Sequence, residues 1–258
     1  MTTASAPTSV SASVPVPVPA SVPSPRRTGL GRTGDATHRC LARLQYGYHR
    51  DDAAAVARIA QIRRGAGRPV DALPELWGLT GLELLYPDGR VGPTDTAAEN
   101  AMHTAVTLWS LHQQSHRSHG MHRPDGPGLG AAVRRLMPAD DVDEPLRKRF
   151  VRAGAAPAFD VLAQRLREIV VLLHRAAVPL DYGVLADQLY LWQLPGRRAE
   201  VIRAWGRGFH AYRPPRAAAG GSGESADGAA DGSATTGGPL SPASATDPDL
   251  IDTDKDQS

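Results

Sequence analysis

The chain has 258 residues, and its 29 Lys and Arg against 27 Asp and Glu give a net charge of +2 at pH 7. Its single cysteine, Cys40, excludes an intramolecular disulfide and a zinc site built on cysteines. No segment approaches the roughly 20 apolar residues that a membrane-spanning helix needs, so we expect a cytoplasmic protein with no membrane partner.

Both ends of the chain differ in composition from its centre. Residues 1–34 are rich in Ser, Pro, Val and Thr and lack an early positive charge, which predicts a disordered tail and no signal peptide. Residues 214–258 are mostly Gly, Ser, Ala, Asp and Pro. Such a segment cannot bury enough apolar surface to fold, so a second disordered tail is predicted there. The folded body is expected to span residues 35–213.

Charge is distributed unevenly along the chain. Residues 217–258 hold eight acidic residues and one basic residue, which leaves 28 basic and 19 acidic residues, a net charge of +9, in residues 1–216. Only Lys148 and Lys255 are lysines. A GC-rich genome accounts for Arg in place of Lys, but not for the surplus. A basic body followed by an acidic tail indicates a polyanionic partner, with the tail as an internal competitor.

Apolar residues in the body recur at three- and four-residue spacings, which predicts helices and no strand. The first helix is expected over residues 36–49. A second begins at a cap provided by Asp51 or Asp52 and runs to about Arg64. Residues 71–86 are apolar but are interrupted by proline and glycine, so short helical turns are predicted there.

A long helix is predicted to follow, with Thr96 and Glu99 as its capping box. Its apolar side chains repeat at three and four residues and must be buried against other helices. They are Ala98, Ala101, Met102, Ala105, Leu108, Trp109 and His112. A polar loop and a shorter helix over residues 128–137 complete this half.

Pro138 and the acidic residues after it mark a predicted domain boundary. Four more helices are expected beyond it, and brief loops between them are typical of a small bundle. They span 144–153, 158–175, 181–193 and 197–212. The predicted fold is therefore all-α, with an N-terminal helical bundle over 35–138 and a C-terminal four-helix bundle over 139–213.

Basic residues gather at helix ends and on outward faces. Examples are Arg63 and Arg64 at the end of the second helix, Arg134 and Arg135 beside an apolar stripe, Arg149 in a strongly basic short helix, and Arg203 with Arg207 opposite the buried Val201. Guanidinium groups bind phosphate in bidentate fashion, so the set indicates contact with nucleic-acid backbone. The alternative is solvated helix faces with local ion pairs such as Glu144–Lys148.

Four histidines within eleven residues, His112, His116, His119 and His122, raise the question of a zinc site. His112 continues the apolar stripe, Gly120 places His119 in a loop, and no acidic residue lies among them to act as a base or to orient a ligand. We therefore predict no metal, no cofactor and no catalytic residue. A zinc-dependent hydrolase is kept as a less favoured hypothesis.

Five segments of the body are informative in their order and spacing. They are IRRGAGRPVDALPELWGL (62–79), LHQQSHRSHGMHRPDGPGLGAAVRRL (111–136), FDVLAQRLREIVVLLH (159–174), PLDYGVLADQLYLWQ (179–193) and VIRAWGRGFHAY (201–212). Together they resemble the CasB family, the small subunit of the type I-E CRISPR surveillance complex Cascade. The likeness spans most of residues 40–212 and leaves out both tails.

The resemblance implies an all-α, non-catalytic subunit that lies in the complex as two copies. Its expected partners are the large subunit, the backbone subunits that hold the guide RNA, a second copy of itself, and the target and displaced DNA strands, so that it stabilises the R-loop in antiviral defence. Matching the family residue by residue assigns backbone contacts to Arg63, Arg64, Arg134, Arg135, Arg149, Arg203 and Arg207. Members of the family are expected to carry more basic residues in the first helix, where this chain has Gln45, Tyr46 and Tyr48. No contact is therefore assigned to this helix.

A second hypothesis follows from the same arginines. They would suit an architectural helical adaptor that binds acidic protein surfaces and does not contact DNA directly.

Overall fold

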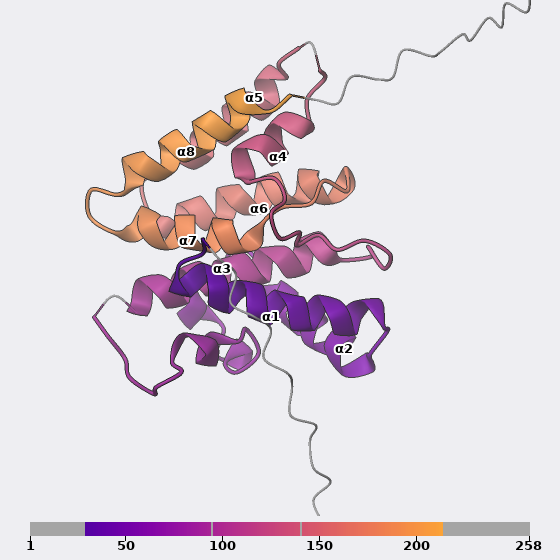
Figure 1. Cartoon of the computed structure of the whole chain (residues 1–258), viewed down its shortest axis with the longest axis vertical. Coiled ribbons are helices and arrows are strands. Elements are labelled where there is room, and N and C mark those ends of the chain that lie inside the picture. The colour runs from indigo at the N-terminus through magenta and orange to yellow at the C-terminus, as the bar shows by residue number, and fades with distance from the viewer. Residues whose placement is uncertain (1–28, 94, 140, 214–258) are drawn as a thin grey trace, which may run out of the picture. The chain divides into compact units, whose positions relative to one another are not determined.

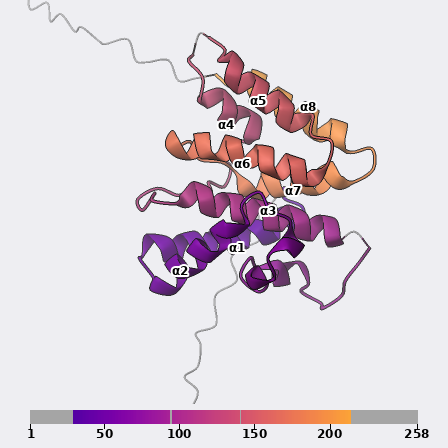
Figure 2. The ribbon, with the colours of Figure 1, turned by 180° about the vertical axis from the view of Figure 1, so that it is seen from behind.

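The structure is a computed structural model, and it describes residues 29–93, 95–139 and 141–213. These residues form an all-α fold, as predicted (Figures 1 and 2). The only β-type pairing among them is a single bridge between His122 and Leu180. The predicted disordered tails lie outside the described residues, apart from residues 29–34. No helix in the described ranges is long and apolar enough to cross a bilayer.

The helices follow the predicted order closely. They are α1 (Arg32–His49), α2 (Ala53–Ile62), α3 (Asp95–Gln113), α4 (Leu129–Arg135), α5 (Glu144–Gly154), α6 (Phe159–Arg175), α7 (Tyr182–Gln193) and α8 (Arg198–Ala211). The region predicted as short turns contains 3-10 helices, as its proline and glycines indicate. These are η2 (Val70–Ala72), η3 (Pro74–Leu76) and η4 (Leu82–Leu85), and η1 (Arg63–Gly65) directly follows α2.

Helix α1 begins at Arg32, inside the segment predicted as a tail. The reason is a cap supplied from another helix. The backbone N–H groups of Gly31 and Gly34 donate to the carboxylate of Asp187 on α7 at 2.7 and 2.6 Å. Gly34 leaves the space for this contact, because a Cβ atom there would lie 2.3 Å from an Asp187 oxygen. Burial raises the pKa of Asp187, whereas these two N–H groups act to lower it.

Helix α3 forms the centre of the fold. It packs against α1, α2, α6 and α7, and Met102, Leu108 and Trp109 are fully buried. The predicted capping box was wrong, because the helix begins at Asp95 and Thr96 therefore lies inside its first turn. Glu99 instead accepts a hydrogen bond from the hydroxyl of Tyr86. The acidic residue in the first turn is Asp95, and a carboxylate there interacts favourably with the helix dipole.

Helix α4 packs closely against α8 at Gly130. A Cβ atom on Gly130 would lie 1.9 Å from the carbonyl oxygen of Trp205 and 2.7 Å from the backbone nitrogen of Phe209. Only glycine permits this approach, which the spacing of apolar residues in the sequence did not reveal. Trp205 and Phe209 are in turn buried beneath α5, where Phe150 stacks on Phe209 with ring centroids 5.7 Å apart.

The helices before and after the predicted boundary at 138 are in direct contact. Helix α1 packs on α7, α3 packs on α6 and α7, and α4 packs on α8. The division of the body into an N-terminal and a C-terminal bundle remains a prediction.

We expect Gly130→Ala to destabilise the protein by about 3 kcal/mol, because the added methyl group meets backbone and cannot be relieved by a side-chain rotation. Gly206→Ala on α8 is the matched control. Its Cβ meets nothing within 4 Å, so the change should stabilise the helix by about 0.5–1 kcal/mol. Urea-unfolding midpoints measure both changes, and a neutral Gly130→Ala would show that α4 does not approach α8 this closely.

Candidate nucleic-acid interface

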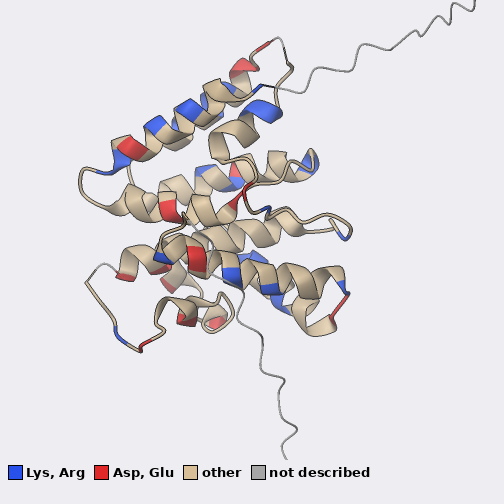
Figure 3. Ribbon diagram, in the orientation of Figure 1, with Lys and Arg blue, Asp and Glu red and all other residues tan. Residues whose placement is uncertain are grey.

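Five of the seven predicted arginines lie on three helices that pack together. Arg134 and Arg135 are in the last turn of α4, Arg149 is on α5, and Arg203 and Arg207 are on α8. These three helices hold nine Lys and Arg but only two Glu. Figure 3 shows basic residues along α8 and at the end of α4.

Arg203 and Arg207 project from the outer side of α8. The inner side buries Val201, Trp205 and Phe209, which repeat at four residues. Both arginines are exposed, and neither forms an ion pair with a carboxylate in the described ranges. The acidic residue of this helix, Glu200, pairs instead with Arg197 at 2.7 Å, and that hydrogen bond lowers the pKa of Glu200. Two exposed guanidinium groups one turn apart can therefore approach a single phosphate strand.

The two arginines of α4 differ in their contacts. Arg134 donates from both terminal nitrogens to the carbonyl oxygens of Pro138 and Ala139, at 2.7 and 2.8 Å. It thereby provides hydrogen-bond donors to carbonyl groups beyond the C-terminus of α4. This contact is structural, whereas the sequence predicted that Arg134 binds phosphate. Arg135 is exposed, and its guanidinium lies 5.6 Å from the ring centre of Tyr212 at the end of α8. That contact holds it near the last turn of α8.

Arg149 is exposed on α5, and it likewise has no ion pair with a described carboxylate. Its neighbour Arg147 pairs with Glu144 through two hydrogen bonds of 2.7 and 2.9 Å. The alternative interpretation paired Glu144 with Lys148, which only adds to the lowering of the Glu144 pKa. One acidic side chain therefore neutralises one of the four bases on this helix.

Arg63 and Arg64 are not part of this group of helices. They lie in η1, which packs against α2 and α3. Arg63 is half-buried and Arg64 is exposed. The described structure thus places the other five arginines on helices in mutual contact, α4, α5 and α8, and this pair on a different element.

The histidines form hydrogen bonds that hold the loop between α3 and α4. The Nδ1 atom of His112 lies 3.0 Å from the hydroxyl of Tyr182, and His122 contacts His38 at 2.9 Å. The Nε2 atom of His116 lies 3.0 Å from the carbonyl oxygen of His174. Among the described residues, no group of three or more His, Cys, Asp or Glu is placed to hold a metal ion.

Gln113 organises the same loop, a role that the sequence analysis missed. Its amide nitrogen donates to the carbonyl oxygens of His116 and His119 at 2.6 and 2.9 Å, and its oxygen accepts from the N–H of Met121 at 2.8 Å. Gln113 is fully buried, and a buried glutamine beside a loop indicates that its amide group bonds to the loop backbone. The spacing of apolar residues in the sequence does not show that Gln113 is buried.

Comparison with known proteins agrees with this fold. The family described as CRISPR-associated protein Cse2 matches residues 58–210. The crystal structure of CasB from Thermobifida fusca is 49% identical with a TM-score of 0.64, and the match covers 70% of this chain and 99% of that one. CasB from Thermus thermophilus is 26% identical with a TM-score of 0.50, covering 69% and 97%. No match was found among curated proteins.

These matches place the chain among the CRISPR-associated proteins. It belongs to the CasB (Cse2) family and is thus a subunit of the type I-E Cascade complex.

Two buried histidines give the free energy of unfolding a dependence on pH. Burial lowers the pKa of His112 to about 3 and that of His103 to about 4, from an ordinary value of 6.5. As the pH falls from 6.5 to 4, the unfolded chain binds protons that the native state excludes, so stability decreases. Each histidine contributes at most about 1.4 kcal/mol per pH unit, and neither contributes a slope above this window.

We therefore expect His112→Gln to flatten the fall of the urea midpoint across this pH range. His119→Gln, which changes an exposed histidine of the same loop, should leave the slope unaltered. Equal slopes for His112→Gln and the parent protein would mean that the native state does not lower the pKa of His112.

Proposed function

We propose that the chain is the non-catalytic small subunit of Cascade, and that basic side chains on α4, α5 and α8 bind nucleic-acid backbone and so stabilise the R-loop. The observation that carries this proposal is the set of exposed arginines Arg135, Arg149, Arg203 and Arg207. None of these four has an ion pair within the described part of the chain. A guanidinium that is not neutralised by a neighbour is free to meet phosphate.

The physical requirements of the role are modest. In guide-directed binding, base pairing reads the sequence, and a guide–target heteroduplex is about as stable as the DNA duplex it replaces. A few backbone contacts therefore decide whether the R-loop persists, and no bond needs to be made or broken. Rigid helices suit this function because they hold guanidinium groups at fixed spacing.

The proposed partners are the large subunit, the backbone subunits with their guide RNA, the target and displaced DNA strands, and a second copy of the chain. Among the predicted residues, Arg203 and Arg207 are the strongest candidates, because α8 fixes them and no described carboxylate pairs with them. Arg134 is the weakest, since two of its five N–H groups are already donated to Pro138 and Ala139. Arg63 and Arg64 would belong to a separate contact.

We expect the double reversal Arg203→Glu with Arg207→Glu to shorten the R-loop lifetime while the complex still co-purifies with its guide RNA. For the isolated protein on duplex DNA, losing two phosphate contacts should reduce the log–log salt slope by about 1.8, since each contact contributes about 0.9. Filter binding between low and physiological salt measures the slope, and a single-molecule tether measures the lifetime.

Arg90→Glu with Arg175→Glu is the matched control, because it changes the charge equally outside α4, α5 and α8. An unchanged R-loop lifetime in the α8 double variant would remove these arginines from the interface. Loss of co-purification with no change in DNA binding would favour the adaptor that binds acidic protein surfaces.

A further inference from the structure

A groove between α1 and α2 lies outside the interface proposed above. It has a volume of about 510 Å³, and its lining includes Arg43, Tyr46, Gly47, Arg50, Asp52 and Arg58. Arg43, Tyr46 and Arg50 occur three and four residues apart, so they share one face of α1. The buried Leu41 and Tyr48 lie on the opposite face, and the buried Leu44 borders the groove.

Tyr46 is the feature of this groove that needs an explanation. Its side chain is 65% exposed, although a single exposed aromatic residue is not unusual by itself. Arg50 holds the ring in place: its guanidinium lies 5.4 Å from the ring centre and donates to the Tyr46 hydroxyl at 3.1 Å. The ring is therefore presented to solvent in a fixed orientation, which lowers the entropy cost of stacking a ligand on it.

Two further cations flank the ring. Arg58 is fixed by hydrogen bonds to the carbonyl oxygens of Leu79 and Gly78, at 2.8 and 3.0 Å. Arg43 is exposed, and it forms no ion pair with a carboxylate of the described residues. Because α1 and α2 are close at Gly47, where a Cβ atom would lie 2.7 Å from that of Ala55, the helices hold these groups at a constant separation.

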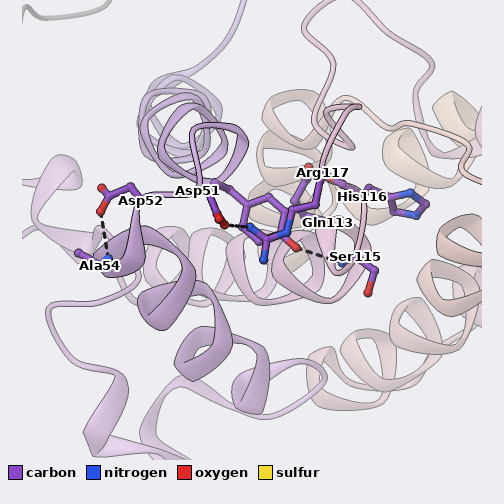
Figure 4. A network of polar contacts seen from close by, with 8 residues as sticks. Asp51, Asp52, Ala54, Gln113, Ser115, His116 and Arg117 are labelled. Carbon is purple, nitrogen blue, oxygen red and sulfur yellow. Dashed lines mark hydrogen bonds and ion pairs between the residues drawn. The ribbon is translucent and has the colours of Figure 1, made fainter.

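The acidic residues nearest the groove already have partners. Asp52 caps α2 by accepting from the N–H of Ala54 at 3.0 Å, and Asp51 pairs with Arg117 of the loop after α3 (Figure 4). Arg117 also lies over the ring of Tyr48, 4.5 Å from its centre. The groove therefore combines an exposed aromatic ring with a surplus of positive charge.

We propose that this groove binds an unpaired nucleotide of single-stranded nucleic acid, with its base stacked on Tyr46 and an adjoining phosphate against Arg43. Arg58, which keeps three of its five N–H groups free, is the weaker phosphate contact. A duplex does not suit the site, because its base faces are covered by neighbouring bases. A basic groove with a stacking platform is the usual combination for single strands and needs no particular sequence. Single-stranded DNA and RNA share this chemistry, and the experiment below separates them.

The test uses the full chain with three fluorescein-labelled probes: oligo(dT), oligo(rU) and a DNA duplex, each about 15 nucleotides or base pairs long, within the range of single-strand site sizes. Loss of one base-stacking contact should make Tyr46→Ala bind the preferred single strand about 5- to 100-fold more weakly by fluorescence anisotropy. Tyr46→Phe keeps the aromatic face and should stay within about twofold of the parent. Duplex binding should not change.

Trp77→Ala is the matched control, because Trp77 is a similarly exposed aromatic residue (67%) that does not line the groove. Circular dichroism confirms that each variant is folded. Equal single-strand affinity for Tyr46→Ala and the parent would overturn the proposal, as would an equal loss in Trp77→Ala. A loss that is the same for duplex and single strands would also overturn it, because it would reflect charge without stacking.

Photocrosslinking gives a second readout. With 5-iodouracil placed in the oligonucleotide, the crosslinked peptide should contain Tyr46, and crosslinks confined to other peptides would count against the site. The α8 double reversal separates the two proposals. If it leaves all binding unchanged while Tyr46→Ala weakens single-strand binding, the groove stands and the interface on α4, α5 and α8 does not.

Discussion

The placement of the basic side chains depends on the backbone contact between α4 and α8 at Gly130. Because that glycine lets one helix approach the carbonyl oxygen of Trp205, the last turn of α4 lies beside the last turn of α8, where Arg135 reaches Tyr212. The same packing buries Trp205 and Phe209 and turns Arg203 and Arg207 outward. Apolar burial thus determines the direction of the charges, and the charges themselves add little to stability.

The helices were predictable because burial on one side of a helix leaves a three- and four-residue apolar repeat, as in α3, α6 and α8. Contacts between distant residues were not predictable. Asp187 caps α1 across 153 positions, and Arg134 reaches carbonyl groups that face it only once the chain has turned at Pro138. The outward direction of Arg203 and Arg207 followed from the helical period, whereas the partners of Arg134 and Arg135 required the fold.

The two proposed contacts use different chemistry. On α4, α5 and α8, guanidinium groups without described carboxylate partners address the phosphate backbone, which is the same in every sequence and in both duplexes and single strands. In the groove between α1 and α2, the exposed ring of Tyr46 adds a surface that only an unpaired base can use. A subunit with both would grip an R-loop through its backbone and would distinguish its separated strand from the paired ones. As a member of the CasB family, the protein would meet both paired and unpaired strands in the Cascade complex.

The cap that Asp187 supplies to α1 also has a consequence for the order of folding. A helix N-terminus without a cap from its own segment is less stable when it forms alone. The carboxylate that caps α1 belongs to α7, which lies late in the described sequence. During synthesis the first turn of α1 therefore gains this cap only after α7 has emerged from the ribosome. An N-terminal fragment that stops before α7 would present an unfinished first turn and the apolar face of α3 to chaperones and proteases.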